Sequence, residues 1–526
     1  MRNAGWKIGI LLAGGLLGLG ALAVWGLPLL QDATAPPGPG LPPLAAVVYE
    51  DAAGGISRWD AGTAAVQSLV GATEPRLQLL GVSADGGQVA YLVAPAPPPA
   101  TPLPTPGAPE LSPVAGDTAA PAYTLRLWQD GSPPLDVPVP EGVAPGLAVQ
   151  FLDSGDLAVL LHATARRPGP LYLYNPDAGR LRQVSPTLDS FALGRGLLAY
   201  AAPETTPAPA GAGGRHVVAL FDVAGAGPAT PVLSVTVPAE SRRPIQLYYE
   251  PAHNAFLSVA ARANGTGGLV NQLGLGLFLA DAPALAHEVT LDTNTGTEGL
   301  AISSSGQYLL YQGVGPQAIP HIPPAQLHVG VPWRVAALDW SGDAPRLTQD
   351  RELTLPDDLF ANSVVFLPGH DRLVVVAQHI AGQVQGGITY PVPLSPTLLL
   401  DDLATGQIET VLDNRAATVL AALDARRLLL ALAAGPAEGQ PDQPPRLALA
   451  ERQNGGWQVQ PLGDAFPSGT QLRFAGLLPD TRAVLLAAVP GSAGAATFYR
   501  VPLDGSPRTP LATLPAAAAY FPIPAP

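Results

Sequence analysis

Short apolar runs separated by polar turns dominate the chain after residue 44. One such unit spans residues 80–93, where two apolar runs flank the turn Asp85-Gly86-Gly87. Glycine supplies the positive φ that a tight turn requires, and the Val and aromatic residues on either side favour strands. The unit therefore predicts a β-hairpin.

The same strand–turn–strand pattern recurs along the chain. Its eight copies have turns near residues 86, 155, 195, 253, 306, 370, 424 and 480. Between them lie about nine units of a second kind, in which an apolar strand precedes an Asp or Asn turn with Gly. Residues 171–184 and 397–412 are the clearest of these. Two alternating half-units therefore account for most of the chain.

This repeat predicts an all-β fold. Four strands of a propeller blade need about 40–50 residues plus insertions, and the hairpins recur every 40–69 residues. One such small sheet cannot bury both of its faces alone, whereas radial stacking buries them. We expect a single β-propeller over residues 45–515 with eight four-stranded blades, or alternatively seven. A half-unit at 45–70 would close the ring against strands at 496–514, leaving 516–526 as a C-terminal tail.

The alternation resembles the TolB-type or WD-like propeller repeat, whose pattern is Ser-Pro-Asp-Gly, an apolar strand, then Leu-Tyr-x-x-Asp-x-x-x-Gly. Ser83-Ala84-Asp85-Gly86 and the stretch from Leu171-Tyr172 to Asp177-Ala178-Gly179 carry it most fully, and no copy holds the complete Ser-Pro-Asp-Gly. The resemblance covers about residues 45–515. It implies the fold class and no particular activity, because propellers serve as both enzymes and scaffolds.

Composition narrows the functional classes. The chain has 526 residues, of which 47% are hydrophobic and 13% charged, and it contains 58 Gly and 61 Pro. Its net charge of −14 argues against a nucleic-acid surface, which needs clustered cations. Lys7 is the only lysine and cysteine is absent, so Schiff-base, P-loop, thiolate and disulfide chemistry have no candidates in the body.

The N-terminal segment predicts membrane targeting. Residues 8–30 carry no charge and follow Arg2 and Lys7. This length can span a hydrocarbon layer of about 30 Å, and the basic flank places the body on the extracytoplasmic side. We expect a single-pass anchor within residues 1–31 of a cell-membrane protein. The alternative is a signal peptide cleaved after Ala21-Leu22-Ala23, which would give a secreted protein.

Three proline-rich stretches lie outside the strand pattern. Residues 32–44 predict a stiff linker between the N-terminal segment and the propeller. The stretches 94–122 and 203–214 cannot pair in sheets, so they are expected to be surface insertions in the propeller. As solvated loops they have no binding role, whereas as polyproline segments they would be recognised by a partner.

Candidate chemistry is sparse. Asp292, Asn294 and Glu298 place side-chain oxygens at alternating positions, as calcium loops do, but the twelve-residue calcium pattern fails. They are a weak calcium candidate, with a capped turn as the default. His321 and His328 share a loop without metal-ligand spacing, and no Gly-x-Ser-x-Gly motif occurs.

Two further residue sets have competing interpretations. Four tryptophans either line a pocket or, as we favour, pack between blades: Trp59, Trp128, Trp340 and Trp457. Six carboxylates either ring a channel mouth or, for the most part, close turns: Asp60, Asp177, Asp339, Asp401, Asp402 and Asp504.

These observations favour a non-catalytic, membrane-tethered propeller that binds a protein, peptide or polysaccharide partner. We expect a monomer with no cofactor, calcium being the one metal considered. The alternative is a lactonase-like or hydrolytic propeller enzyme with a carboxylate-bound metal in its central channel. A third interpretation is a structural component of the cell envelope.

Overall fold

A computed structural model describes most of the chain from residue 41 onward. The described residues all belong to one compact unit, Pro39–Pro526. They are 41–72, 77–93, 123–138, 148–152, 157–160, 170–204, 214–225, 227–238, 245–262, 271–293, 300–314, 332–341, 345–356, 359–385, 388–432, 444–453, 456–491, 495–515 and 519–525.

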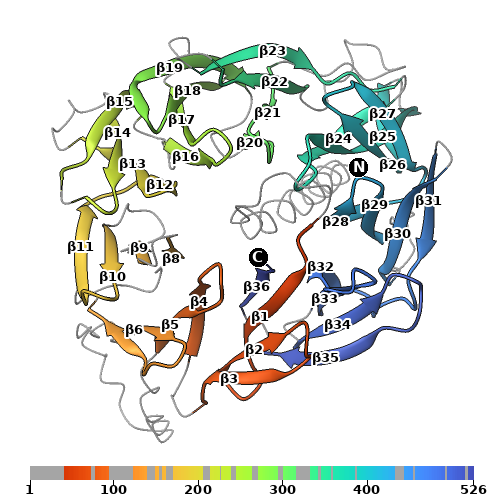
Figure 1. Cartoon of the computed structure of the whole chain (residues 1–526). Coiled ribbons are helices and arrows are strands. Elements are labelled where there is room, and N and C mark those ends of the chain that lie inside the picture. The colour runs from red at the N-terminus through yellow and green to blue at the C-terminus, as the bar shows by residue number, and fades with distance from the viewer. Residues whose placement is uncertain are drawn as a thin grey trace, which may run out of the picture. The chain divides into compact units, whose positions relative to one another are not determined.

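The described residues form nine four-stranded antiparallel sheets, arranged as the blades of a ring (Figure 1). We number them blades 1–9 around the ring. Blades 2–5 each use four consecutive strands, with the first innermost. Blade 2 contains β4 (Leu77–Val82), β5 (Gln88–Val93), β6 (Thr124–Gln129) and β7 (Leu135–Val137); blade 3 contains β8 (Ala148–Phe151), β9 (Leu157–Leu160), β10 (Leu171–Asn175) and β11 (Arg180–Ser185); blade 4 contains β12 (Ser190–Leu193), β13 (Leu197–Pro203), β14 (Gly214–Asp222) and β15 (Thr230–Val237); blade 5 contains β16 (Ile245–Glu250), β17 (Ala255–Arg262), β18 (Asn271–Leu279) and β19 (Ala282–Thr293).

Blades 6–9 repeat this arrangement. Blade 6 contains β20 (Ala301–Ile302), β21 (Tyr308–Gln312), β22 (Trp333–Asp339) and β23 (Arg346–Glu352); blade 7 contains β24 (Leu359–Phe366), β25 (Arg372–Gln385), β26 (Ile388–Asp402) and β27 (Gln407–Leu412); blade 8 contains β28 (Ala417–Asp424), β29 (Arg427–Leu432), β30 (Arg446–Gln453) and β31 (Gly456–Pro461); blade 9 contains β32 (Gln471–Leu477), β33 (Ala483–Val489), β34 (Ala496–Pro502) and β35 (Thr509–Leu514).

Blade 1 closes the ring with strands from both ends of the described chain. Its outer three strands are β1 (Leu44–Glu50), β2 (Ile56–Asp60) and β3 (Val66–Val70), whereas its innermost strand is β36 (Tyr520–Pro524). β36 pairs antiparallel with β1, so that Val48 lies opposite Phe521. Ile523 packs with Val48 and with residues of blade 2. The closure is therefore both hydrogen-bonded and apolar.

The hydrophobic core is distributed between the blades. The buried apolar residues of the described chain form nine clusters, each joining two neighbouring blades. One cluster joins blade 9 to blade 1, where Phe498 packs against Tyr49. The middle strands are therefore buried on both faces, as β17 and β33 show. This explains why their sequences read as continuous apolar runs.

These observations confirm the all-β propeller and correct its details. The predicted eight blades, or seven, are wrong, because the described residues already form nine sheets. Each of the eight sequence hairpins joins the first two strands of one blade, whereas blade 1 takes its first strand from the other end of the chain and has no such turn. Within the half-unit at 45–70, β1 therefore pairs with β36 and not with the strands at 496–514. The stretch 516–526, expected to be a tail, contains this closing strand.

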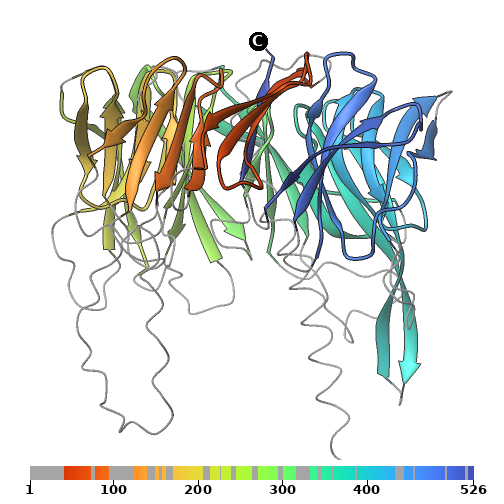
Figure 2. The ribbon, with the colours of Figure 1, turned by 90° about the horizontal axis from the view of Figure 1, so that it is seen from below.

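The two edges of the ring differ. One edge, the turn face, carries the short turns between first and second and between third and fourth strands. The opposite edge, the loop face, carries the connections between second and third strands. There the β25–β26 hairpin projects beyond the other blades, at the lower right of Figure 2. Insertion 94–122 and most of 203–214 join second to third strands and lie outside the described residues.

Candidate functional site

The predicted calcium residues are only partly within the described chain. Asp292 lies in β19, and its Oδ1 accepts a hydrogen bond from Nε2 of Gln272 on the neighbouring strand at 2.9 Å. Asn294 and Glu298 lie outside the described residues, so the calcium site stays a prediction. Among the residues that the structure does describe, no three His, Asp or Glu side chains cluster closely enough to hold a metal ion.

Most of the six carboxylates considered in the sequence close turns, as expected. The carboxylate of Asp60 accepts a backbone hydrogen bond from Thr63, and that of Asp504 accepts one from Ser506. Asp339 and Asp402 close the corresponding turns of blades 6 and 7. Asp401 differs because it is 1% exposed and its Oδ2 has no hydrogen-bond partner. Burial raises the pKa of this carboxyl group above its ordinary value.

The tryptophans pack between blades, again as expected. Trp59, Trp128 and Trp340 are buried and belong to three different inter-blade clusters. Trp457 is partly buried against blade 7, and its Nε1 donates a hydrogen bond to Glu409 at 2.9 Å. Trp340 has a second role, because it also lines a cavity.

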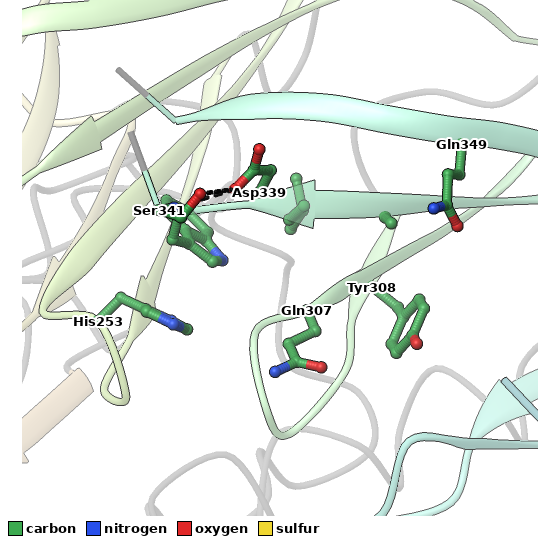
Figure 3. Close-up of a pocket in the computed structure, with 9 residues that line it drawn as sticks. His253, Gln307, Tyr308, Asp339, Ser341 and Gln349 are labelled. Atoms are coloured by element: carbon green, nitrogen blue, oxygen red, sulfur yellow. Dashed lines mark hydrogen bonds between the residues drawn. The ribbon is translucent and has the colours of Figure 1, made fainter. Parts of the chain in front are cut away.

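This cavity lies on the turn face between blades 5 and 6 and measures about 380 Å³ (Figure 3). Its walls combine ring side chains, amides and a carboxylate, without Lys or Arg. They are formed by His253, Gln307, Tyr308, Ala337, Leu338, Asp339, Trp340, Ser341 and Gln349. The cavity combines ring surface with hydrogen-bonding groups, and we take it as the candidate site.

A buried carboxylate positions one wall of the cavity. Glu250 is 2% exposed, and its oxygens accept hydrogen bonds from the backbone N–H groups of Ala252 and His253 at 2.8 and 2.7 Å. Oε2 also lies 2.8 Å from Nδ1 of His253. Both the backbone turn and the imidazole ring of His253 are therefore held by one side chain.

Blade 6 presses against this carboxylate from the other side. Gly306 has φ of +69°, and a Cβ atom there would overlap Cγ and Cδ of Glu250. The carbonyl of Gly306 accepts a 2.7 Å hydrogen bond from Nε1 of Trp340. The indole ring then stacks on His253, with ring centroids 5.6 Å apart and planes at 19°. Glycine is therefore required at 306 for both its backbone angle and its small size.

The carboxylate in the wall is ionised and fixed. Oδ1 of Asp339 accepts hydrogen bonds from the backbone and hydroxyl groups of Ser341, and Oδ2 accepts one from Nε of Arg346 at 3.0 Å. These bonds lower the pKa of Asp339 to about 2, the hydroxyl of Ser341 being the largest cause. Asp339 is therefore ionised at every physiological pH, and its charge is paired with that of Arg346.

Gln349 enters the cavity from a distorted strand. The pairing of β22 with β23 shifts register between Val335 and Ala337, and Gln349 lies in the resulting irregularity with φ of +50°. A non-glycine residue with positive φ is strained, and β-bulges re-aim side chains next to functional sites. Figure 3 shows the amide of Gln349 directed toward Tyr308.

The arrangement suits binding more than bond breaking. Ring surfaces and amide groups can hold a polar ligand by packing and by hydrogen bonds that both donate and accept. Of the wall residues, the sequence points to only two: Trp340, as an inter-blade packing residue or alternatively a pocket residue, and Asp339, as a turn-closing or channel-mouth carboxylate. Gln307, Tyr308 and Gln349 were missed. The hairpin turn at 306 was the one available signal, because it brings Gln307 to the turn face.

A scan of protein-family models found no match to the sequence, and a search of curated proteins found none either. Solved structures do resemble the fold. A structure described as a eukaryotic initiation factor aligns with 92% of this chain and 99% of its own, at 12% identity and a TM-score of 0.51. The propeller domain of the trilobed protease from Pyrococcus furiosus aligns at 10% identity and a TM-score of 0.28, over 62% and 97% of the two chains.

The chain is a β-propeller. The likeness to the initiation-factor structure shows the fold alone, because the identity is low. The predicted propeller class agrees with it at this level, without pointing to a particular member.

The N-terminal prediction is not tested by the structure. The described part of the chain contains no helix long and apolar enough to cross a membrane. Residues 8–30 and the linker up to residue 40 lie outside that part.

Proposed function

We propose that the propeller is a non-catalytic binding module that holds a neutral, polar polymer in the cavity between blades 5 and 6. The observation that carries this proposal is the strained backbone of Gln349, whose amide is directed into the cavity. Left-handed strain costs about 1–3 kcal/mol and persists where the surroundings or a function require it. A glycine would occupy this position without strain, but it would bring no amide.

The wall chemistry selects the ligand class. The wall contains no Lys or Arg, and its one charged side chain, Asp339, is already paired with Arg346, so the wall offers no free cation to phosphates, carboxylates and other anions. Two amides and the hydroxyl of Ser341 match ligands that carry many hydroxyl groups, and Tyr308 and Trp340 offer apolar ring surface. A neutral oligosaccharide segment fits this combination best.

The experiment compares Gln349→Gly with Thr481→Gly in the full chain purified in detergent. Both residues have a positive φ, +50° and +52°, but Thr481 lies in a turn of blade 9 and outside the cavity wall. Calorimetric titration with neutral cello-, manno- and malto-oligosaccharides is expected to reveal a saturable ligand. Gln349→Gly should weaken its binding about tenfold, the cost of one good hydrogen bond.

The two variants also separate binding from stability. Both substitutions relieve left-handed strain, so each should leave the free energy of unfolding unchanged or raise it by up to about 1 kcal/mol. Thr481→Gly should bind as the wild type does. If no oligosaccharide binds the wild type, or if Gln349→Gly binds equally well, the proposed function is wrong.

We further propose that residues 8–30 tether this module to the cell membrane with the propeller on the extracytoplasmic side. The support is the uncharged stretch behind Arg2 and Lys7. N-terminal sequencing of protein extracted from membranes would find Met1 for an anchor. A new N-terminus after Ala23 would show a cleaved signal peptide and secretion instead.

The enzyme alternative rests on carboxylates in the propeller. A lactonase-like or hydrolytic propeller would need several of them around one metal ion, and four of the six carboxylates considered in the sequence close turns instead. Elemental analysis of the purified full chain tests this, because a stoichiometric divalent metal would favour the enzyme over the binding module.

A further inference from the structure

The hairpin formed by β25 and β26 is much longer than its neighbours in the same blade. Beyond His379 the only described strand that pairs with β25 is β26, and β27 pairs with β26 only from Leu398 onward. We call residues 380–385 and 388–394 the arm. It continues as a two-stranded ribbon past the loop face, as Figure 2 shows.

The arm carries no charged side chain. No Asp, Glu, Lys or Arg occurs between Arg372 and Asp401, although the whole chain carries a net charge of −14. Two apolar side chains on it are exposed, Val384 at 70% and Leu394 at 49%. The arm itself therefore adds no charge repulsion between copies of the chain.

The pairing register fixes which backbone groups point outward. Gln385 pairs with Ile388 across a two-residue connection, and such a closing pair exchanges its hydrogen bonds within the hairpin. Pairs then alternate along an antiparallel ribbon. The pairs whose backbone N–H and C=O groups point away from the ribbon are Val384 with Thr389, Gly382 with Pro391 and Ile380 with Pro393.

Proline closes one of these two edges. Two of the three outward positions on β26, at 391 and 393, lack an N–H group because they are proline. These positions agree with the register, since proline occurs within a sheet where its missing N–H would point away from the partner strand. β25 keeps all three outward N–H and C=O groups, at Ile380, Gly382 and Val384. The arm therefore offers a single open strand edge.

We propose that this open edge pairs antiparallel with the same edge of a second copy of the chain. A two-fold axis at Gly382 places Ile380 of each copy opposite Val384 of the other. The edge is thus self-complementary in its backbone groups and in its apolar residues, as a two-fold interface requires. An open strand edge is a template for such pairing.

The properties of the arm favour a second copy of the chain as its pairing partner. The pattern apolar–Gly–apolar at 380, 382 and 384 is symmetric about its centre, and its lack of charge allows two acidic chains to meet. The paired segment is short, well below the roughly 1,200 Å² of a stable interface, so association should be weak and should depend on concentration. This differs from the monomer expected from the sequence.

Single cysteines provide the test, because the chain has none of its own. Residues opposite each other in a hydrogen-bonded antiparallel pair have Cα atoms about 5.5 Å apart, which suits a disulfide bond. The full chain in detergent is oxidised with copper phenanthroline as Gly382→Cys and as Thr389→Cys, its matched control on the closed edge. Gly382→Cys should form covalent dimers at least about tenfold faster.

A second measurement uses no cross-link. Sedimentation of the wild type should show a dimer fraction that rises with concentration. Gly382→Pro, which removes the central N–H, should abolish that fraction, whereas Gly382→Ala and Thr389→Pro should keep it. A wild type that stays monomeric at all concentrations, equal cross-linking of the two cysteine variants, or dimers that survive Gly382→Pro would each overturn the proposal. Oligosaccharide titration measures binding at the cavity on the turn face, whereas dimerisation involves the arm on the loop face. Either proposal can therefore fail without the other.

Discussion

Replacing Gly306 by alanine should disrupt the junction between blades 5 and 6. The change has two consequences that the structure separates. Alanine in the left-handed region costs about 1–2 kcal/mol. In addition, its Cβ would overlap Cγ and Cδ of the buried Glu250, which cannot move without breaking the bonds that hold the turn at residues 251–254.

The second consequence is the larger one. Glu250 accepts hydrogen bonds from two backbone N–H groups at 2.8 and 2.7 Å and also contacts Nδ1 of His253. Hydrogen bonds to charged groups contribute about 1.5–3 kcal/mol each. If Glu250 were displaced, new hydrogen bonds to water would recover part of this energy. We expect Gly306→Ala to lower the free energy of unfolding by about 3–5 kcal/mol in total.

Gly369 is a matched control. It occupies the corresponding turn of blade 7 with φ of +76°, and a Cβ atom there would meet no other atom within 4 Å. Gly369→Ala should therefore cost only the conformational part, about 1–2 kcal/mol.

The assay is urea unfolding of both full-length variants in detergent, with the denaturant slope checked for constancy. Hydrogen exchange gives a local measurement, because amides at 251–254 should exchange faster only in Gly306→Ala. If the two variants unfold within about 1 kcal/mol of each other, the inferred overlap with Glu250 does not govern this junction.

Two further substitutions test other features of the propeller. Asp401→Asn should stabilise the protein at pH 7: burial raises the pKa of Asp401, so the folded wild type loses stability as pH rises above about 4, whereas the variant does not. Equal stability differences at pH 4 and pH 7 would contradict this. Ile523→Ala should cost about 2–4 kcal/mol in thermal or urea unfolding, because Ile523 is buried in the closing strand, against almost nothing for the exposed Val66→Ala.

The repeat can be predicted from the sequence because contacts between residues close in sequence specify each turn. In the first hairpin, Oδ1 of Asp85 accepts hydrogen bonds from the N–H of Gly87 and the hydroxyl of Ser83, and Gly86 has a positive φ of +72°. These are contacts between near neighbours, so residue identity alone predicts them. The eight hairpin turns understate the number of blades because blade 1 has no such turn, whereas the units of the second kind, about nine, follow the number of blades.

The candidate cavity cannot be predicted from the sequence in the same way. Gln349 has no turn signal, and its positive φ arises from the register shift between β22 and β23, which depends on strand pairing. Glu250 reads as an ordinary polar residue before a turn, and its burial depends on the approach of Gly306 from the next blade. The sequence does not reveal the arm because β26 continues into residues 397–412, which the pattern predicts as one half-unit.

Ring closure also determines how long β1 stays unpaired while the chain is being synthesised. β1 and β36 lie almost at opposite ends of the sequence, so at translation rates of 5–20 residues per second β1 waits roughly half a minute to a minute and a half for its partner. During that time its inner edge remains unpaired, with Ala46, Val47 and Val48 exposed to any extended chain nearby. Chaperone demand should therefore be greatest for the first strand made and should end only when the last one arrives.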